Sequence, residues 1–273
     1  MRTAVKSPWF PALTLIAISL LALASLRYIR AAHAGARSVG DAAPRTPVLI
    51  ELFTSEGCSS CPPADALLEK LDRTQPVRDA DLIVLSEHVD YWDDGGWRDP
   101  YSSHELSIRQ SAYAQRFRLN GPYTPQMIVD GDMEFVGSDE RRAIQVVESA
   151  VKTPKLPIAL SSIRREGNNT FAMHIEAGPF LSSESEAPAQ VRIALADDSD
   201  RSSIGGGENA GRTLKYVAVL RNLTQVGTIN YGGKFSKDVK VTAENTKQAN
   251  LRIIAIVQQT AVGKVLGVTS AEF

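Results

Sequence analysis

Two cysteines three positions apart are the residues of this chain with the most specific chemistry. Cys58 and Cys61 are the only cysteines among 273 residues, so all thiol chemistry depends on them. They follow the apolar run 48–53 and precede the helical pattern of 64–71. A Cys-x-x-Cys at the start of a helix is typical of disulfide exchange, because the helix N-terminus favours a thiolate and lowers its pKa.

The two thiols take different roles in this hypothesis. Cys58 is the nucleophile, because the first cysteine lies nearer the helix end and should be more exposed. Its thiolate exchanges with a partner disulfide, and Cys61 then resolves the mixed disulfide. We expect a protein or peptide thiol or disulfide as the substrate, and no cofactor beyond the redox-active disulfide itself. Residue types do not reveal whether the protein oxidises, reduces or isomerises its substrate.

Three alternative interpretations of the cysteine pair stay open. A purely structural disulfide is one, although so short a loop removes little chain entropy. A second is metal binding, with His88 or His104 and Asp90 completing a zinc site. Copper held by both cysteines and His88 is the other form of this alternative. The third is a partner-binding module whose dithiol is not catalytic. Because two thiolates supply only half of a tetrahedral site, we favour exchange and predict no metal.

The composition is that of an ordinary globular protein. Hydrophobic residues make up 43% and charged residues 22%, which disfavours disorder and coiled coil. The formal net charge is -1. Without the first 34 positions, which hold four basic residues and no acid, it is about -5. The sequence shows no basic patch, which argues against nucleic acid as a partner.

The first 34 residues have the pattern of an export segment. Arg2 and Lys6 precede the uncharged, mostly aliphatic stretch 10–26, and Ala32-His33-Ala34 fits a small-x-small cleavage site. Residues 1–34 are therefore a signal peptide or an uncleaved N-terminal anchor. Either interpretation places the protein in the periplasm or outside the cell, free or anchored to the inner membrane. A membrane contact is expected only through this segment.

Residues 35–45 are rich in small residues and predict a linker. From 46 to 152 the order strand, helix, strand, helix, hairpin, helix predicts an α/β layer. The predicted segments are strands at 48–53 and 81–86, helices at 64–71, 102–117 and 138–151, and a hairpin at 123–136. Ser102 with Glu105 predicts a capping box, and Asp130-Gly131 predicts the hairpin turn.

Pro62 and Pro63 limit where the first helix begins. If Cys58 were the N-cap, Pro62 and Pro63 would be expected to donate backbone hydrogen bonds within the first helical turn, and proline has no amide hydrogen to donate. Either that turn is distorted, or the regular helix starts near Pro62.

Beyond Pro154 and Pro157 no helical period persists, and short alternating patterns predict about seven strands. They lie near 158–165, 171–177, 191–195, 214–221, 235–241, 251–257 and 264–269. We therefore expect residues 156–273 to form an all-β, sandwich-like domain.

Two polar segments have alternative interpretations. His88, Asp90 and Trp92 belong either to a packed, hydrogen-bonded loop or to the rim of the active-site groove, since ligands bind at the ends of parallel strands. Gly205–Gly207 does not fit the spacing of a dinucleotide or phosphate loop. It predicts a mobile loop, with a contact to the N-terminal domain or to a partner as the alternative.

Three motifs carry a family resemblance. They are residues 51–65, 88–93 and 207–212, and the likeness covers roughly 46 to 273. The chain resembles secreted, thioredoxin-like bacterial proteins grouped as domain of unknown function 1223. The resemblance implies an exported protein with a thioredoxin-like domain at 46–152 that carries the Cys-x-x-Cys. It supplies no substrate.

Residues 52–63, Thr124–Pro125 and 129–137 also look like thioredoxin's active-site turn, its segment before the hairpin, and the hairpin itself. This likeness implies that Pro125 is cis, faces the dithiol, and that Thr124 holds a substrate strand through its backbone. The likeness stops at Leu52, where thioredoxin carries a buried acid. Glu51 is one residue earlier, so a regular strand points it to the other face.

Overall fold

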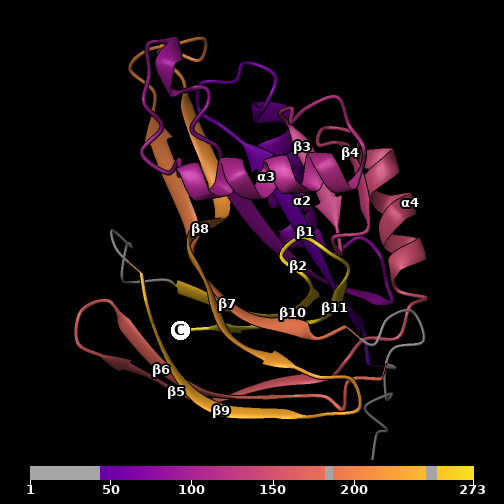
Figure 1. Cartoon of the computed structure of the whole chain (residues 1–273). Helices are drawn as coiled ribbons and strands as arrows, with labels where there is room; N and C mark the ends of the chain where they lie inside the picture. The colour runs from indigo at the N-terminus through magenta and orange to yellow at the C-terminus, as the bar shows by residue number, and fades with distance from the viewer. Residues whose placement is uncertain (1–43, 182–186, 244–250) are drawn as a thin grey trace, which may run out of the picture. The chain divides into compact units, whose positions relative to one another are not determined.

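One eight-stranded mixed sheet organises the protein (Figure 1). The computed structural model describes residues 44–181, 187–243 and 251–273, so the predicted export segment and almost all of the predicted linker lie outside the described residues. The strand order is β11-β10-β7-β8-β2-β1-β3-β4. These strands are β1 (Thr46–Thr54), β2 (Ala80–His88), β3 (Gln126–Val129), β4 (Met133–Val136), β7 (Ala189–Ser203), β8 (Thr213–Ile229), β10 (Leu251–Gln259) and β11 (Val265–Glu272).

The two central strands place polar side chains together at one edge of this sheet. β1 and β2 are parallel, and their register pairs Thr54 with His88 at the carboxyl ends. Both strands are buried along most of their length, as expected for apolar runs in a parallel arrangement. The chain turns from β1 directly into the cysteine segment, so the ends of β1 and β2 underlie the cysteines.

Three α-helices lie among the described residues: α2 (Pro62–Thr74), α3 (His104–Arg116) and α4 (Glu140–Ala150). α2 begins at Pro62 with Cys61 as its N-cap, which confirms the second of the two predicted starts. The capping box predicted at Ser102 is wrong, because Ser103 is the N-cap of α3 and Ser102 donates its hydroxyl to Asp93 instead. None of the helices in the described part of the chain is long and apolar enough to span a membrane.

The predicted order of elements in the first half is confirmed, including the β3–β4 hairpin. The connection is residues 130–132, in which Asp130 and Gly131 both have positive φ, 49° and 60°, and the amide of Asp132 donates to the carbonyl of Val129 at 3.0 Å. A Cβ atom at Gly131 would lie 2.2 Å from the carbonyl oxygen of Gly263, so the turn also packs against the β10–β11 connection.

The predicted combination of an α/β thioredoxin-like domain with a following, separate all-β domain is wrong. β7, β8, β10 and β11 join the same sheet as β1–β4, through a parallel contact of β2 with β8 at Ser86 and Val219. The protein is therefore mostly β. The reason is that β2 would otherwise leave a long buried strand at an open sheet edge, which proteins generally cover.

A second, three-stranded sheet completes the fold in the lower part of Figure 1. Its order is β5 (Ile158–Glu166), β6 (Thr170–Ala177) and β9 (Phe235–Thr242). Phe171 and Ile175 of β6 belong to one hydrophobic cluster with Ile193 of β7 and Ile253 of β10. The predicted strands thus exist, but they are divided between two sheets. The domain division at 152–156 stays a prediction, since a shared sheet does not decide whether either half folds alone.

Candidate functional site

Cys58 and Cys61 form a disulfide in the turn between β1 and α2. The Cα atoms are 5.4 Å apart, and the turn is closed by a hydrogen bond from the amide of Cys61 to the carbonyl of Cys58. Both cysteines are completely buried, whereas Ser59 and Ser60 between them are exposed. The expected exposure of Cys58 is therefore wrong for this conformation.

The disulfide is covered by the turn between β7 and β8, residues 204–212, which we call the cap. Asn209 of the cap is buried, and its side-chain amide donates to the carbonyls of Glu56 and Cys58 at 2.8 and 2.9 Å. The Glu208 carboxylate accepts a hydrogen bond of 3.1 Å from the amide of Ser59. The alternative prediction, a contact of this loop with the N-terminal half, is thus confirmed, and the mobility of the loop stays a prediction.

Glycines allow the cap to approach so closely. A Cβ atom at Gly206 would lie 2.4 Å from the carbonyl oxygen of Gly96, and one at Gly205 would lie 2.9 Å from the ring of Trp97. The cap therefore packs on the segment around η1 (Asp93–Gly95), beside which it lies at the top of Figure 1. Trp97 in turn donates its indole N–H to the Glu56 carboxylate at 2.6 Å.

Trp92 links the cysteine turn to the predicted substrate-binding segment. Its indole donates to the Thr124 hydroxyl at 2.8 Å, and its Cβ lies against Gly57, where an added Cβ would be 2.9 Å away. The Thr124–Pro125 peptide bond is cis, the isomer that the resemblance implies. The structure thus brings Trp92 and Thr124 to the cysteine turn, while their contact with a substrate stays a prediction.

Asp90 is held by α3. Its carboxylate accepts hydrogen bonds from the Ser107 hydroxyl at 2.5 Å and pairs with the imidazole of His104 at 3.0 Å. The hydrogen bond from Ser107 lowers the pKa of Asp90. The His104 side chain is largely exposed. The contacts of Asp90 are those of a hydrogen-bonded loop, and a place for Asp90 at the rim of a substrate groove stays a prediction.

His88 lies beneath the cysteine turn and is fully buried. Its Nδ1 is 2.7 Å from the Asp99 carboxylate, which also accepts hydrogen bonds from the amides of Glu56 and Tyr101. Burial disfavours the charged imidazole, but the negative charge of Asp99 outweighs it and raises the pKa of His88. The rings of Tyr101 and Tyr216 pack edge-on against the imidazole, with centroids 5.2 and 4.7 Å away.

Asp65 is a further buried acid beside the disulfide that the sequence analysis did not single out. It lies in the first turn of α2, and its backbone amide donates to the carbonyl of Cys61 at 3.1 Å. Its side-chain Oδ1 accepts from the Thr54 hydroxyl at 2.8 Å. Burial raises the pKa of Asp65 to about 7, against the lowering effects of His88 and Thr54. The sequence position of Asp65 could have indicated its burial, because it lies one helical turn after Cys61 and one turn before the buried Leu68.

Glu51 faces away from the cysteines, as predicted. It binds the guanidinium of Arg109 on α3 and accepts a hydrogen bond of 2.7 Å from the Tyr113 hydroxyl. Burial raises the pKa of Glu51, but the Arg109 charge and these hydrogen bonds outweigh burial and lower it. Glu51 thus anchors α3 to the sheet.

The zinc and copper alternatives both need at least one ligand besides the two cysteines. Across residues 44–181, 187–243 and 251–273, no group of three or more His, Cys, Asp or Glu side chains is arranged to hold a metal ion. The imidazole of His88 is engaged by Asp99, and that of His104 by Asp90.

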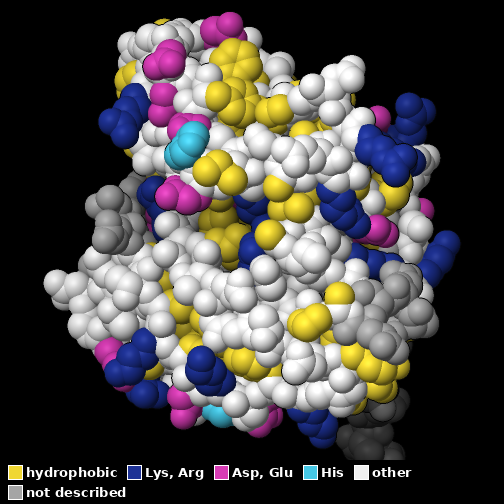
Figure 2. Space-filling view, viewed as in Figure 1, with side chains coloured by type: hydrophobic (Ala, Val, Ile, Leu, Met, Phe, Trp, Pro, Cys, Tyr) yellow, Lys and Arg dark blue, Asp and Glu magenta, His cyan; other side chains and the backbone are white. Residues whose placement is uncertain are grey.

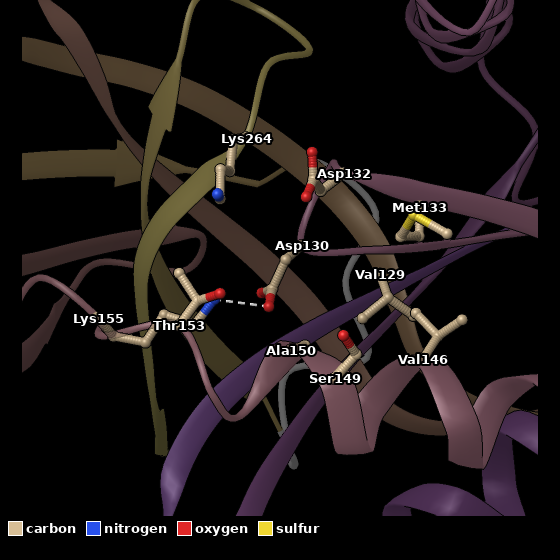
Figure 3. Close-up of a pocket in the computed structure, with 10 residues that line it drawn as sticks. All are labelled: Val129, Asp130, Asp132, Met133, Val146, Ser149, Ala150, Thr153, Lys155 and Lys264. Carbon is tan, nitrogen blue, oxygen red and sulfur yellow. Dashed lines mark hydrogen bonds and ion pairs between the residues drawn. The ribbon is translucent and has the colours of Figure 1, made fainter. Parts of the chain in front are cut away.

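Neither of two pockets elsewhere on the surface is lined by a cysteine. Figure 3 shows the smaller, about 60 Å³, where Asp130 points toward Lys155 and pairs with it at 2.6 Å. The larger, about 710 Å³, is a groove between α3 and β8 that contains Arg109, Arg192 and Arg221. Figure 2 shows hydrophobic and basic side chains in a recess across the middle of the visible face.

Fold and site together define a mixed-sheet protein whose disulfide closes the turn before a helix and lies under a hairpin cap. The chain belongs to the family described as protein of unknown function (DUF1223), whose model matches residues 49–258. No curated protein matches the chain.

Two solved structures are similar over most of the chain. One is a structural-genomics protein from Agrobacterium tumefaciens, with 25% identity and a TM-score of 0.63, covering 83% of this chain and 94% of that one. The other is HBP35 of Porphyromonas gingivalis, with 14% identity and a TM-score of 0.58, covering 84% of this chain and 75% of that one. The second likeness concerns the fold alone.

Proposed function

We propose that the protein exchanges its Cys58–Cys61 disulfide with thiols or disulfides of protein or peptide substrates. The observation that carries this proposal is the disulfide in the turn that leads into α2, with Cys61 as the N-cap of the helix. The positive end of the helix dipole favours a thiolate at this place. A buried acid and a buried His–Asp pair next to the turn are further support, because they supply groups that can move protons.

The exchange runs in two steps. In the reduced protein the Cys58 thiolate attacks one sulfur of a substrate disulfide, and the other substrate sulfur leaves as a thiolate. The Cys61 thiolate then attacks Sγ of Cys58, which restores the Cys58–Cys61 disulfide and releases the reduced substrate. Two electrons pass from the protein to the substrate, and the reverse sequence oxidises the substrate. The reduction potential of the dithiol sets the direction.

The cap controls access to the disulfide in this proposal. Because both cysteines are buried, the cap must move before a substrate sulfur reaches Cys58. The side chains of Glu208 and Asn209 make the hydrogen bonds that hold it to the cysteine turn. Opening one hairpin tip requires much less free energy than unfolding the molecule.

Trp92, Thr124 and Pro125 form the proposed substrate-binding side of the turn. The hydrogen bond between Trp92 and Thr124 and the packing of Trp92 on Gly57 support this assignment, because they fix the segment beside the cysteines. We propose that the substrate strand binds along this segment once the cap has moved.

We further propose that the protein works in the periplasm or outside the cell, either free or tethered to the inner membrane by its N-terminal segment. The support is the sequence of residues 1–34, together with the general persistence of disulfides in oxidising compartments. The proposal includes no cofactor other than the disulfide.

Trapping of mixed disulfides tests the exchange function. In Cys61→Ala the intermediate cannot be resolved, so covalent complexes with periplasmic proteins should accumulate through Cys58 and disappear on treatment with a reductant. Cys58→Ala is the matched control, since it keeps one cysteine in the same turn and should form few complexes. If Cys61→Ala folds but forms no more complexes than the control, exchange is refuted. The burial of both cysteines would then favour a structural disulfide.

A further inference from the structure

We propose that Asp65, supported by the His88–Asp99 pair, is the proton donor and acceptor for Cys61 during disulfide exchange. This inference rests on the proposed exchange function and deepens it. It assigns a role to the buried polar cluster at the ends of β1 and β2, which the two-step exchange itself does not use.

Asp65 lies one helical turn after Cys61, and its backbone amide donates to the Cys61 carbonyl at 3.1 Å. Residues four apart share one face of a helix, and helical side chains lean toward the N-terminus, so Asp65 points back toward the turn of Cys61. The hydroxyl of Thr54 fixes Oδ1 at 2.8 Å. The second oxygen, Oδ2, is buried and has no hydrogen-bond partner, which leaves it available to a reacting group.

Two neighbouring side chains also carry a buried polar atom that has no hydrogen-bond partner. Nε2 of His88 and the hydroxyl of Tyr216 are also buried without a partner, and both side chains interact electrostatically with Asp65. Nearly all buried polar atoms in proteins have partners, so several unpartnered ones around one acid point to a function. Oε1 of Glu56 is a further buried atom without a partner, while its Oε2 accepts a hydrogen bond from Trp97, and Asp99 is hydrogen-bonded to His88.

The exchange creates a need for such a proton donor. When a substrate thiolate forms a bond with Sγ of Cys58, the Cys58–Cys61 bond breaks and its electron pair leaves with Sγ of Cys61. A thiolate in this buried place is disfavoured by desolvation. Transfer of the proton from Asp65 converts it to a thiol, and the charged imidazole of His88 stabilises the carboxylate that remains. In the reverse step Asp65 takes the proton back.

The electrostatic environment suits this role at neutral pH. Burial has the largest effect on the pKa of Asp65 and raises it. Asp99 and Glu56 also raise this pKa, whereas His88 and Thr54 lower it, and the resulting pKa is about 7. His88 faces Asp99, Asp65 and Glu56, and the rings of two tyrosines. An acid whose pKa lies near the working pH transfers protons most effectively in both directions.

The test is the pH profile of the rate at which dithiothreitol reduces the folded, oxidised protein. Each rate is divided by the thiolate fraction of the reagent, so that only protein groups shape the profile. For the wild type we expect the corrected rate to fall as pH rises through about 7. Asp65→Asn should lose this inflection and react at least about tenfold more slowly at pH 6.

A second variant, Thr54→Val, tests the role of Asp65 without replacing its carboxyl group. Thr54→Val keeps the carboxyl but removes the hydrogen bond that lowers its pKa, so the inflection should move to higher pH. Glu69→Gln, which removes a carboxylate one turn further along α2, should retain the wild-type profile.

An inflection that persists in Asp65→Asn, or one that does not move in Thr54→Val, overturns the inference. If Asp65→Asn does not fold, Thr54→Val decides alone. A wild-type protein that reacts with a flat corrected profile refutes the role of Asp65 but leaves exchange intact. A folded wild type that dithiothreitol does not reduce at all refutes the exchange function itself.

Discussion

Two buried acids on opposite sides of β1 show how neighbours decide charge in this protein. Burial raises the pKa of both Glu51 and Asp65. At Glu51 the guanidinium of Arg109 and the hydroxyl of Tyr113 outweigh burial, so the group stays charged and serves structure. Asp65 receives one hydroxyl from Thr54, and its pKa rises to about 7. Asp65 therefore gains or loses its proton near neutral pH.

This raised pKa predicts a pH-dependent stability difference for Asp65→Asn. The folded protein binds a proton on Asp65 up to about pH 7, whereas the unfolded chain releases it near the ordinary value of 3.8. The wild type therefore loses stability as pH rises through this interval, by up to about 4 kcal/mol. Because Asn cannot ionise, the free energy of unfolding of Asp65→Asn should improve relative to wild type between pH 4 and pH 8.

Urea unfolding of both proteins at these two pH values, with the disulfide intact, measures the effect. Asp79→Asn removes an exposed carboxylate as the control and should show no such change. An equal difference between Asp65→Asn and wild type at both pH values would contradict the assignment.

At the scale of elements, the β7–β8 hairpin has two functions. Its strands connect the halves of the sheet through Ser86 and Val219, and its turn forms the cap. β7 has 15 residues and β8 has 17, which corresponds to about 50 Å of extended chain. This length carries the turn beyond the body of the sheet to the cysteines. Sheet formation and access to the disulfide are thus linked in one element.

The close contact of the cap at Gly206 yields a second prediction. In Gly206→Ala the added methyl group would lie 2.4 Å from the carbonyl oxygen of Gly96, so the cap must move. We expect glutathione to reduce the disulfide several-fold faster, with a loss of about 1–3 kcal/mol in the free energy of unfolding.

Gly121→Ala provides the matched control for this substitution. It adds the same methyl group where nothing lies within 4 Å, and Gly121 has no positive φ. Its reduction rate should equal that of the wild type. An unchanged rate in Gly206→Ala would mean that the cap does not limit access.

At the scale of the whole molecule, periodicity in the sequence predicted where elements lie but not how they combine. The apolar run of β1 and the alternation at Phe171 and Ile175 identify strands, because side-chain direction repeats every two residues. Alternation does not reveal which strand pairs with which, so the contact between Ser86 and Val219 was missed. The shared sheet follows from that contact.

Some residues of the candidate site could be predicted from the sequence, and others could not. Cys58 and Cys61 were found because their residue type and spacing carry the chemistry. A contact of the loop at Gly205–Gly207 with the N-terminal domain was one predicted alternative, but its place over the cysteines was not predicted, because Asn209 is 151 residues away from Cys58 in the chain. Asp65 was missed because an acid in the first turn of a helix is ordinarily a response to the helix dipole. Its burial depends on the packing of α2 against β8, a strand far from it in the sequence.

In the proposed function the disulfide reacts in the folded protein through a local opening of the cap. The most direct test exposes wild-type protein to glutathione at several urea concentrations below the unfolding transition, followed by alkylation and mass spectrometry of Cys58 and Cys61. Local opening predicts a measurable reduction rate without urea that changes little as urea is added. A rate that is undetectable without urea and rises with the full urea dependence of global unfolding would contradict the account.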